Sequence, residues 1–150
     1  MKTFTALSVC LMLSLGCHAQ EDLAAYSRLN TTDSLGRKQG LWMERFDDGT
    51  PEAVMRYKND TLDGVSIWFS KDGGLQVYSA FVNGKKHGSS RAVDQWDGTV
   101  RVTLYNQGVV QLVQVFDAQG KLALEEFYSG GTITKSVHHT PSGIIEGHPR

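Results

Sequence analysis

Glycine recurs along this chain at a nearly constant interval of about 24 residues, and an interval of that size limits the fold to a stack of similar units. Three series of positions share it. The first runs through Gly36, Asp60, Gly84, Gly108 and Gly131, and the second through Gly40, Gly64, Gly88 and Leu112. The third runs through Gly49, Gly73, Gly98, Gly120 and Gly143, at intervals of 24, 25, 22 and 23 residues. These glycines are predicted to mark the turns of a repeat.

The segments between the glycines have the pattern of β-strands. Hydrophobic residues alternate with other residues over 65–70 and again over 100–105, which is the period of a sheet with two unlike faces. Asp-Gly and Asn-Gly pairs between such segments permit the positive φ angles of tight hairpin turns. We therefore predict an all-β chain, an elongated antiparallel sheet of stacked hairpins with two strands in each unit. The units are expected near residues 36–59, 60–83, 84–107, 108–130 and 131–150.

With these glycines and its aromatic residues, the chain resembles the MORN-repeat family, in particular a bacterial variant of the form G-x-x-x-G-x-W-x-x-x-(F/Y)-x-x-x-G. Residues 36–60 match that form best, with Trp42 and Phe46 at its aromatic positions. Residues 60–84 keep Phe69 but carry their tryptophan at position 68, and the match weakens from residue 84 onward. The resemblance implies a non-catalytic scaffold, and some related bacterial proteins are labelled antitoxins of toxin–antitoxin pairs.

The first 19 residues are predicted to be a signal peptide. Lys2 precedes an uncharged apolar run over residues 4–15, which is too short for a transmembrane helix. Cys17-His18-Ala19 suits cleavage before Gln20, which would give an exported periplasmic or extracellular chain. Leu15-Gly16-Cys17 resembles the end of a lipobox, and in that alternative Cys17 carries the lipid of an outer-membrane lipoprotein. No transmembrane segment is predicted in the mature chain.

Residues 20–35 are predicted to be an N-terminal cap or linker before the first unit. Residues 22–29 suit one short helix, and residues 30–34 have the composition of a loop.

Composition excludes several classes of function. Both cysteines, Cys10 and Cys17, lie in the signal region, so the mature chain is expected to lack disulfides, thiolate metal sites and a cysteine nucleophile. Without Lys2 the chain carries 14 basic and 16 acidic residues, a net charge of −2, mixed along its length. No stripe for binding nucleic acid is therefore expected. No glycine-rich loop opens a helix to hold a phosphate, and no cofactor is predicted.

The candidate catalytic residues are better explained by turns. Asp48, Asp72 and Asp97 each precede a turn glycine at the same place in the repeat. His87 occupies a junction position that holds glutamine or aspartate in other units, so it is also predicted to be a turn residue. Gly88-Ser89-Ser90 lacks the second glycine of a nucleophile elbow. The chain is therefore predicted not to be an enzyme.

Four residues that can bind metals gather near the C-terminus, namely His138, His139, Glu146 and His148. Adjacent residues of a strand point to opposite faces, so His138 and His139 cannot both bind one ion while the strand is intact. A solvated tail is the favoured interpretation, and metal binding by this group stays open.

Aromatic residues supply the remaining surface signal, and most of them are expected to fill the core of the thin sheet. They are Trp42, Phe46, Tyr57, Trp68, Phe69, Tyr78, Phe81, Trp96, Tyr105, Phe116, Phe127 and Tyr128. Alternation places Trp68 opposite Val65, Ile67 and Phe69, on a face expected to be less apolar and available to a partner. Trp42, Trp68 and Trp96 are the candidates for an interaction surface.

Together these patterns favour an exported, non-catalytic repeat protein that acts as a protein–protein interaction scaffold at the bacterial envelope, with an unknown protein partner. The alternatives are a cell-wall or glycan-binding β-solenoid module, an antitoxin-like or immunity protein, and an envelope hydrolase.

Overall fold

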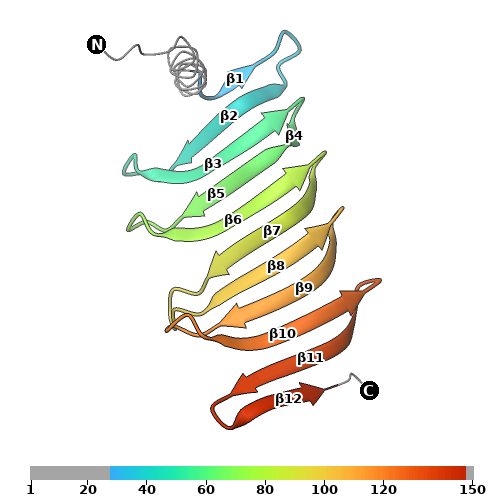
Figure 1. Cartoon of the computed structure of the whole chain (residues 1–150). Coiled ribbons are helices and arrows are strands. Elements are labelled where there is room, and N and C mark those ends of the chain that lie inside the picture. The colour runs from blue at the N-terminus through green and yellow to red at the C-terminus, as the bar shows by residue number, and fades with distance from the viewer. Residues whose placement is uncertain (1–27, 148–150) are drawn as a thin grey trace, which may run out of the picture.

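The computed structural model describes residues 28–147, and every regular element in that range is a β-strand (Figure 1). The strands are β1 (Thr31–Thr32), β2 (Lys38–Arg45), β3 (Pro51–Lys58), β4 (Thr61–Leu62), β5 (Gly64–Phe69), β6 (Leu75–Val82), β7 (Lys85–Val93), β8 (Val100–Asn106), β9 (Val109–Phe116), β10 (Leu122–Ser129), β11 (Thr132–Thr140) and β12 (Gly143–Gly147). The predicted all-β class is thereby confirmed. The predicted signal peptide lies outside the described residues, as does nearly all of the helix predicted over residues 22–29.

The strands form a single open antiparallel sheet whose order follows the chain. Each strand pairs with the next, except that the short β4 and then β5 both pair with β3. Consecutive antiparallel strands can be joined by tight turns alone, which is what the closely spaced turn glycines allow. The result is an elongated strip with β1 at one end and β12 at the other (Figure 1).

One long edge of the strip, which we call the short-turn edge, carries four two-residue turns. These turns are Asn59-Asp60, Asn83-Gly84, Gln107-Gly108 and Gly130-Gly131. Both residues of each turn have positive φ, from 49° at Asn83 to 86° at Gly108. This is the conformation of a type I′ turn, whose twist matches that of the flanking strands. Asp60 adopts it with φ 63°, which explains how an aspartate can occupy a position of the first glycine series.

The opposite edge, which we call the long-turn edge, carries the two-residue β11–β12 turn and four longer turns that share a hydrogen-bond pattern. In the β2–β3 turn the Phe46 N–H donates to the Thr50 carbonyl and the Gly49 N–H donates to the Phe46 carbonyl, both over 2.9 Å. Equivalent bonds close the β5–β6 and β9–β10 turns. The β7–β8 turn is one residue longer. Its Gly98 N–H therefore donates to the carbonyl four residues earlier, that of Asp94, at 3.0 Å.

All twelve glycines of the three series have positive φ. Gly64 is the most constrained of them, with φ 119° and with Arg56 Cδ only 2.7 Å from the position that a Cβ would take. A side chain at residue 64 would therefore meet both backbone strain and a steric clash.

The densest packing lies on one face of the sheet, which we call the serine face. A row of directly paired residues crosses five strands there, through Ser66, Ser79, Ser90, Thr103 and Val113. None of the five side chains is more than 7 % exposed. No second layer of secondary structure covers this row within residues 28–147, so larger side chains of the same face must cover it. Met55 and Phe81, both also buried, lie on that face.

Successive turns of the short-turn edge are tied together by a recurring side-chain brace. Gln39 Oε1, Asp63 Oδ1 and His87 Nδ1 each accept a hydrogen bond from the backbone N–H of the residue 20 positions later, at 3.2, 3.4 and 3.4 Å. His87 lies in strand β7, so its prediction as a turn residue was wrong. The predicted equivalence of His87 with Gln39 and Asp63 holds, because the three side chains accept equivalent hydrogen bonds. In the fourth unit Gln111 bonds instead to the carbonyls of Val109 and Val110.

The predicted loop over residues 30–34 is also corrected, because Thr31 and Thr32 form β1 against β2. The Asn30 side chain extends this pairing, since its Oδ1 accepts from the Met43 N–H at 2.7 Å and its Nδ2 donates to the Met43 carbonyl at 3.0 Å. Without β1, strand β2 would be the edge of the sheet. Its free backbone N–H and C=O groups explain the pairing, because they form hydrogen bonds with a segment that lies alongside.

Candidate functional site

The face opposite the serine face, which we call the arginine face, carries an uninterrupted row of paired residues from β2 to β12. Its members are Met43, Val54, Ile67, Tyr78, Arg91, Val102, Gln114, Glu125, Val137 and Glu146. The first four members are apolar or aromatic, and Arg91 is the first charged side chain in the row. The described part of the chain gives the half-buried Arg91 side chain no hydrogen bond or ion pair.

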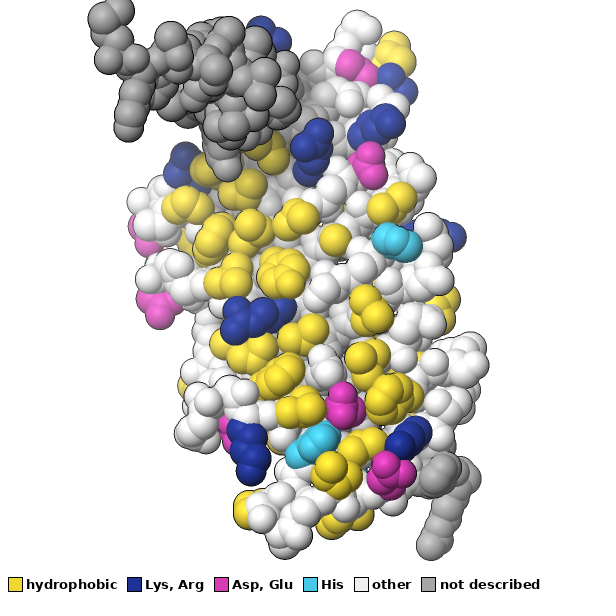
Figure 2. Space-filling view, viewed as in Figure 1, with side chains coloured by type: hydrophobic (Ala, Val, Ile, Leu, Met, Phe, Trp, Pro, Cys, Tyr) yellow, Lys and Arg dark blue, Asp and Glu magenta, His cyan; other side chains and the backbone are white. Residues whose placement is uncertain are grey.

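Large hydrophobic side chains are exposed along the arginine face. Val65, Leu104, Phe127 and Ile144 are exposed by 51, 44, 37 and 64 %, and they come from four different hairpins. Seen face-on, the sheet carries hydrophobic side chains from one end to the other, with charged side chains and histidines between them (Figure 2). A soluble domain normally buries such a face against a second layer, so an extended exposed apolar surface indicates a contact site.

The placement of Trp68 corrects the expectation about the two faces. Trp68 pairs with Ala53 and Val77 on the serine face, which holds most of the buried side chains. Val65, on the other face, is half exposed. The alternation was predicted correctly, but the assignment of the exposed face was wrong. The small serines are buried because larger side chains of neighbouring strands cover them. The hydrophobic pattern of a single strand cannot predict this burial.

The twelve aromatic residues do not form a closed core. Phe81 is the only one of them that is buried, Trp96 and Phe127 are exposed, and the others are half-buried. Two of the three candidate tryptophans share the serine face, because Trp42 pairs with Met55 and Trp68 pairs with Ala53. Trp42 packs edge-on against Tyr57 at 6.2 Å between ring centroids, and Lys38 Nζ lies 4.5 Å from the centroid of Trp42. Trp96 lies in the β7–β8 turn and is 98 % exposed.

The turn aspartates each accept hydrogen bonds within their own turns through one carboxylate oxygen. The Asp48, Asp72 and Asp97 carboxylates accept hydrogen bonds from the backbone N–H groups of Thr50, Gly74 and Thr99, at 2.9, 3.3 and 2.8 Å. The pKa of Asp48 is lowered first by the Thr50 hydroxyl, and that of Asp72 by the Ser70 hydroxyl. The pKa of Asp97 is lowered first by the Thr99 N–H. Ionised, hydrogen-bonded carboxylates of this kind stabilise turns and are poor general acids.

The C-terminal histidines are separated by the sheet. His138 pairs with Leu124 and Ile145, whereas His139 pairs with Ile144 and belongs to the opposite face. His139 Nε2 lies 3.0 Å from Glu125 Oε2, and Lys135 Nζ lies 2.8 Å from Glu146 Oε1. The Gln114 amide and then His139 lower the pKa of Glu125. Within residues 28–147 no three residues are grouped to bind a metal ion, and His148 lies outside that range.

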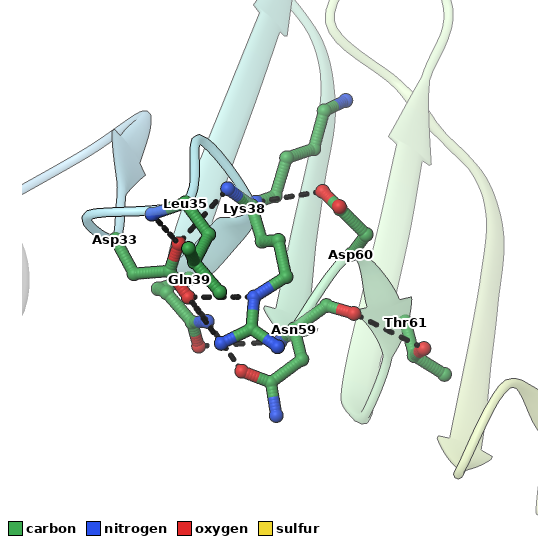
Figure 3. A network of polar contacts seen from close by, with 8 residues as sticks. Asp33, Leu35, Lys38, Gln39, Asn59, Asp60 and Thr61 are labelled. Atoms are coloured by element: carbon green, nitrogen blue, oxygen red, sulfur yellow. Dashed lines mark hydrogen bonds and ion pairs between the residues drawn. The ribbon is translucent and has the colours of Figure 1, made fainter.

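A polar network joins the N-terminal turn to the first repeat (Figure 3). The Asp33 carboxylate pairs with Arg37, accepts the backbone N–H groups of Leu35 and Arg37, and accepts from Gln39 Nε2 at 3.0 Å. The hydrogen bond from the Arg37 side chain is the main reason that the pKa of Asp33 falls to about 2. Gln39 Nε2 also donates to Asn59 Oδ1 at 2.7 Å, so one amide links two turns. The network has a structural role in attaching β1 to the repeats.

Arg91 is the functional candidate that sequence reasoning missed. Its neighbours in the chain, Ser90 and Ala92, point to the opposite face, so nothing local marks it. Arg91 lies between Tyr78 of β6 and Val102 of β8, and this placement can be known only from the register of the strands.

Fold and surface together define a one-layer β-hairpin repeat protein with one exposed apolar face. Compared with known proteins, the chain matches no family model and no curated sequence. In the described range, no helix has the length and apolar character needed to cross a membrane.

Proposed function

We propose that this protein is an exported, non-catalytic scaffold of the MORN-repeat type that binds another protein through its arginine face. The observation that carries the proposal is the set of exposed apolar side chains that four hairpins present on this face, together with Arg91, which has no hydrogen bond or ion pair within the described residues. Arginine and aromatic side chains are enriched among the residues that dominate binding energy at protein interfaces, and the buried centre of an interface is more apolar than its rim. The partner's surface is expected to be apolar and to carry a carboxylate opposite Arg91.

Adjacent exposed isoleucines on β12 allow a matched test. Ile144 belongs to the arginine face and is 64 % exposed, whereas Ile145 belongs to the serine face and is 59 % exposed. The tagged protein and its Leu104→Asp, Ile144→Asp and Arg91→Glu variants would be used to capture proteins from envelope extract, with Ile145→Asp as the control. Thermal unfolding of each variant would verify that it folds.

We expect each arginine-face variant to capture at least tenfold less of one protein, which corresponds to a loss of about 1.4 kcal/mol or more of binding free energy. Ile145→Asp should capture the same amount of that protein as wild type. Equal capture by all variants would contradict the proposal. Retention on insoluble wall glycan without any protein partner would favour the glycan-binding alternative.

Export and lipid anchoring form a separate part of the proposal, which rests on the sequence of residues 1–19. Radiolabelled palmitate should not enter the protein if cleavage occurs before Gln20. Incorporation that disappears in Cys17→Ala would instead establish the lipoprotein alternative.

A further inference from the structure

The β7–β8 turn differs from the β2–β3, β5–β6 and β9–β10 turns of the long-turn edge in two ways. It contains one additional residue, and it presents Trp96 with 98 % of its surface exposed. An indole that is fully in solvent contributes no packing to the fold, and burying it would remove a large apolar area from water. The sheet therefore does not explain this tryptophan.

Trp96 borders a depression of about 470 Å³ between the β5–β6 and β7–β8 turns. The lining combines apolar and polar groups, namely Leu75, Val93, Ser70, Asp72, Asp94 and Gln95. Its volume falls in the range of small-molecule sites, and such sites combine an apolar surface with a few fixed polar groups.

The two carboxylates of the depression are held in place by the turns. Asp94 Oδ1 accepts the backbone N–H of Trp96 at 2.8 Å, which fixes the carboxylate within the β7–β8 turn. Asp72 Oδ1 accepts the Gly74 N–H and the Ser70 hydroxyl. The second carboxylate oxygen of each aspartate has no hydrogen bond within the described range, so both remain available as acceptors.

We propose that this depression binds a saccharide, with one pyranose ring stacked on Trp96. A pyranose has an apolar face of C–H groups, which suits the electron-rich face of an indole, and hydroxyl groups at its rim that can donate to the fixed carboxylates and to the Gln95 amide oxygen. Arg101 and Asp94 line an adjoining hollow of about 250 Å³. A cationic side chain is therefore a poorer occupant of the depression, because it would lie close to the positive charge of Arg101. That adjoining hollow favours an oligosaccharide over a single sugar.

The purified protein would be titrated with soluble β-1,4-linked oligomers of N-acetylglucosamine and of glucose, by calorimetry and tryptophan emission. Binding by one exposed aromatic residue in an open depression should be weak, with Kd on the order of 1 mM. Emission should shift to shorter wavelength as the ring covers Trp96. Trp96→Ala should abolish both signals, whereas Trp96→Phe should weaken binding and Gln95→Ala should reduce it several-fold.

Because Trp96 is fully exposed, Trp96→Ala is expected to leave the unfolding temperature unchanged, so loss of binding cannot be attributed to unfolding. Leu35→Ala, at a 74 % exposed residue of another turn, is the control. Absence of binding by both oligomers up to about 10 mM, binding that survives Trp96→Ala, or a response to an arginine-rich peptide alone would overturn the proposal. None of these outcomes bears on protein binding by the arginine face, which is tested independently.

Discussion

At the scale of single residues, the buried row of the serine face contains one hydrogen-bonded pair of hydroxyls and one hydroxyl without a partner among the described residues. Ser79 Oγ lies 2.6 Å from Ser90 Oγ, whereas Ser66 Oγ has no hydrogen-bond partner among the described residues. A buried hydroxyl that is unpaired lowers stability, because it has lost its hydrogen bonds to water.

We therefore expect opposite effects from two identical substitutions. Ser66→Ala should raise the free energy of unfolding by about 1 kcal/mol, and Ser79→Ala should lower it by about 1 kcal/mol. Urea denaturation at constant m-value measures both. A loss of stability in Ser66→Ala as large as that in Ser79→Ala would show that Ser66 is hydrogen-bonded in solution.

Asp33 provides a prediction of pH dependence. Its pKa is lowered to about 2 by Arg37, so the folded state prefers the ionised carboxylate. A group whose pKa is lower in the folded state contributes stability above its unfolded pKa, and that stability is lost as the pH falls toward the folded pKa. Wild-type protein should therefore lose stability between about pH 4 and pH 2.

The measurement is the unfolding temperature from pH 5 to pH 2 for wild type and Asp33→Asn. The variant should be less stable at pH 5 and should lose less on acidification. Parallel curves for the two proteins would show that the Asp33 network does not persist in solution. Asp48, Asp72, Asp97 and Glu125 also have lowered pKa values, so some acid sensitivity remains in the variant.

At the scale of elements, the side-chain braces between successive turns of the short-turn edge differ in strength. The Gln39 side chain accepts the Asn59 N–H and donates to both Asp33 and Asn59, whereas the His87 side chain makes one hydrogen bond of 3.4 Å. Gln39→Ala should lower the free energy of unfolding by about 1–2 kcal/mol, and His87→Ala by about 0.5 kcal/mol or less. Chemical denaturation tests the order. Equal effects would mean that the braces contribute through packing and not through hydrogen bonds.

Much of this level of structure could be predicted from sequence, because the glycine intervals fix where each hairpin turns. The face that becomes buried could not, since the burial of Ser66 depends on side chains from neighbouring strands. The same reason hid Arg91, whose neighbours across the sheet are set by register. The extra residue of the Trp96 turn is visible in the interval of 25 between Gly73 and Gly98, but its exposure is not.

At the scale of the whole molecule, each strand touches its neighbours in the sheet and stability should be distributed along the strip. Repeat proteins of this kind lose structure locally, beginning at their ends. Hydrogen exchange should be slowest in β6–β9 and faster toward β2 and β12.

Val137→Ala provides the perturbation, because Val137 is only 6 % exposed in β11. Removing its methyl groups should cost on the order of 2 kcal/mol. We expect exchange to accelerate in β10–β12 and to stay unchanged in β2–β5, as measured by amide exchange with residue-level resolution. Uniform acceleration across the strip would indicate a single cooperative unit.

The two long edges of the strip also differ in their tolerance of inserted residues. A two-residue type I′ turn cannot lengthen without changing the twist between its strands, so the short-turn edge should accept few insertions. The β7–β8 turn has already gained a residue relative to its counterparts while the pairing of β7 with β8 stays regular. New segments can thus enter along the long-turn edge one hairpin at a time, and a repeat of this kind can diversify what it binds without altering its sheet.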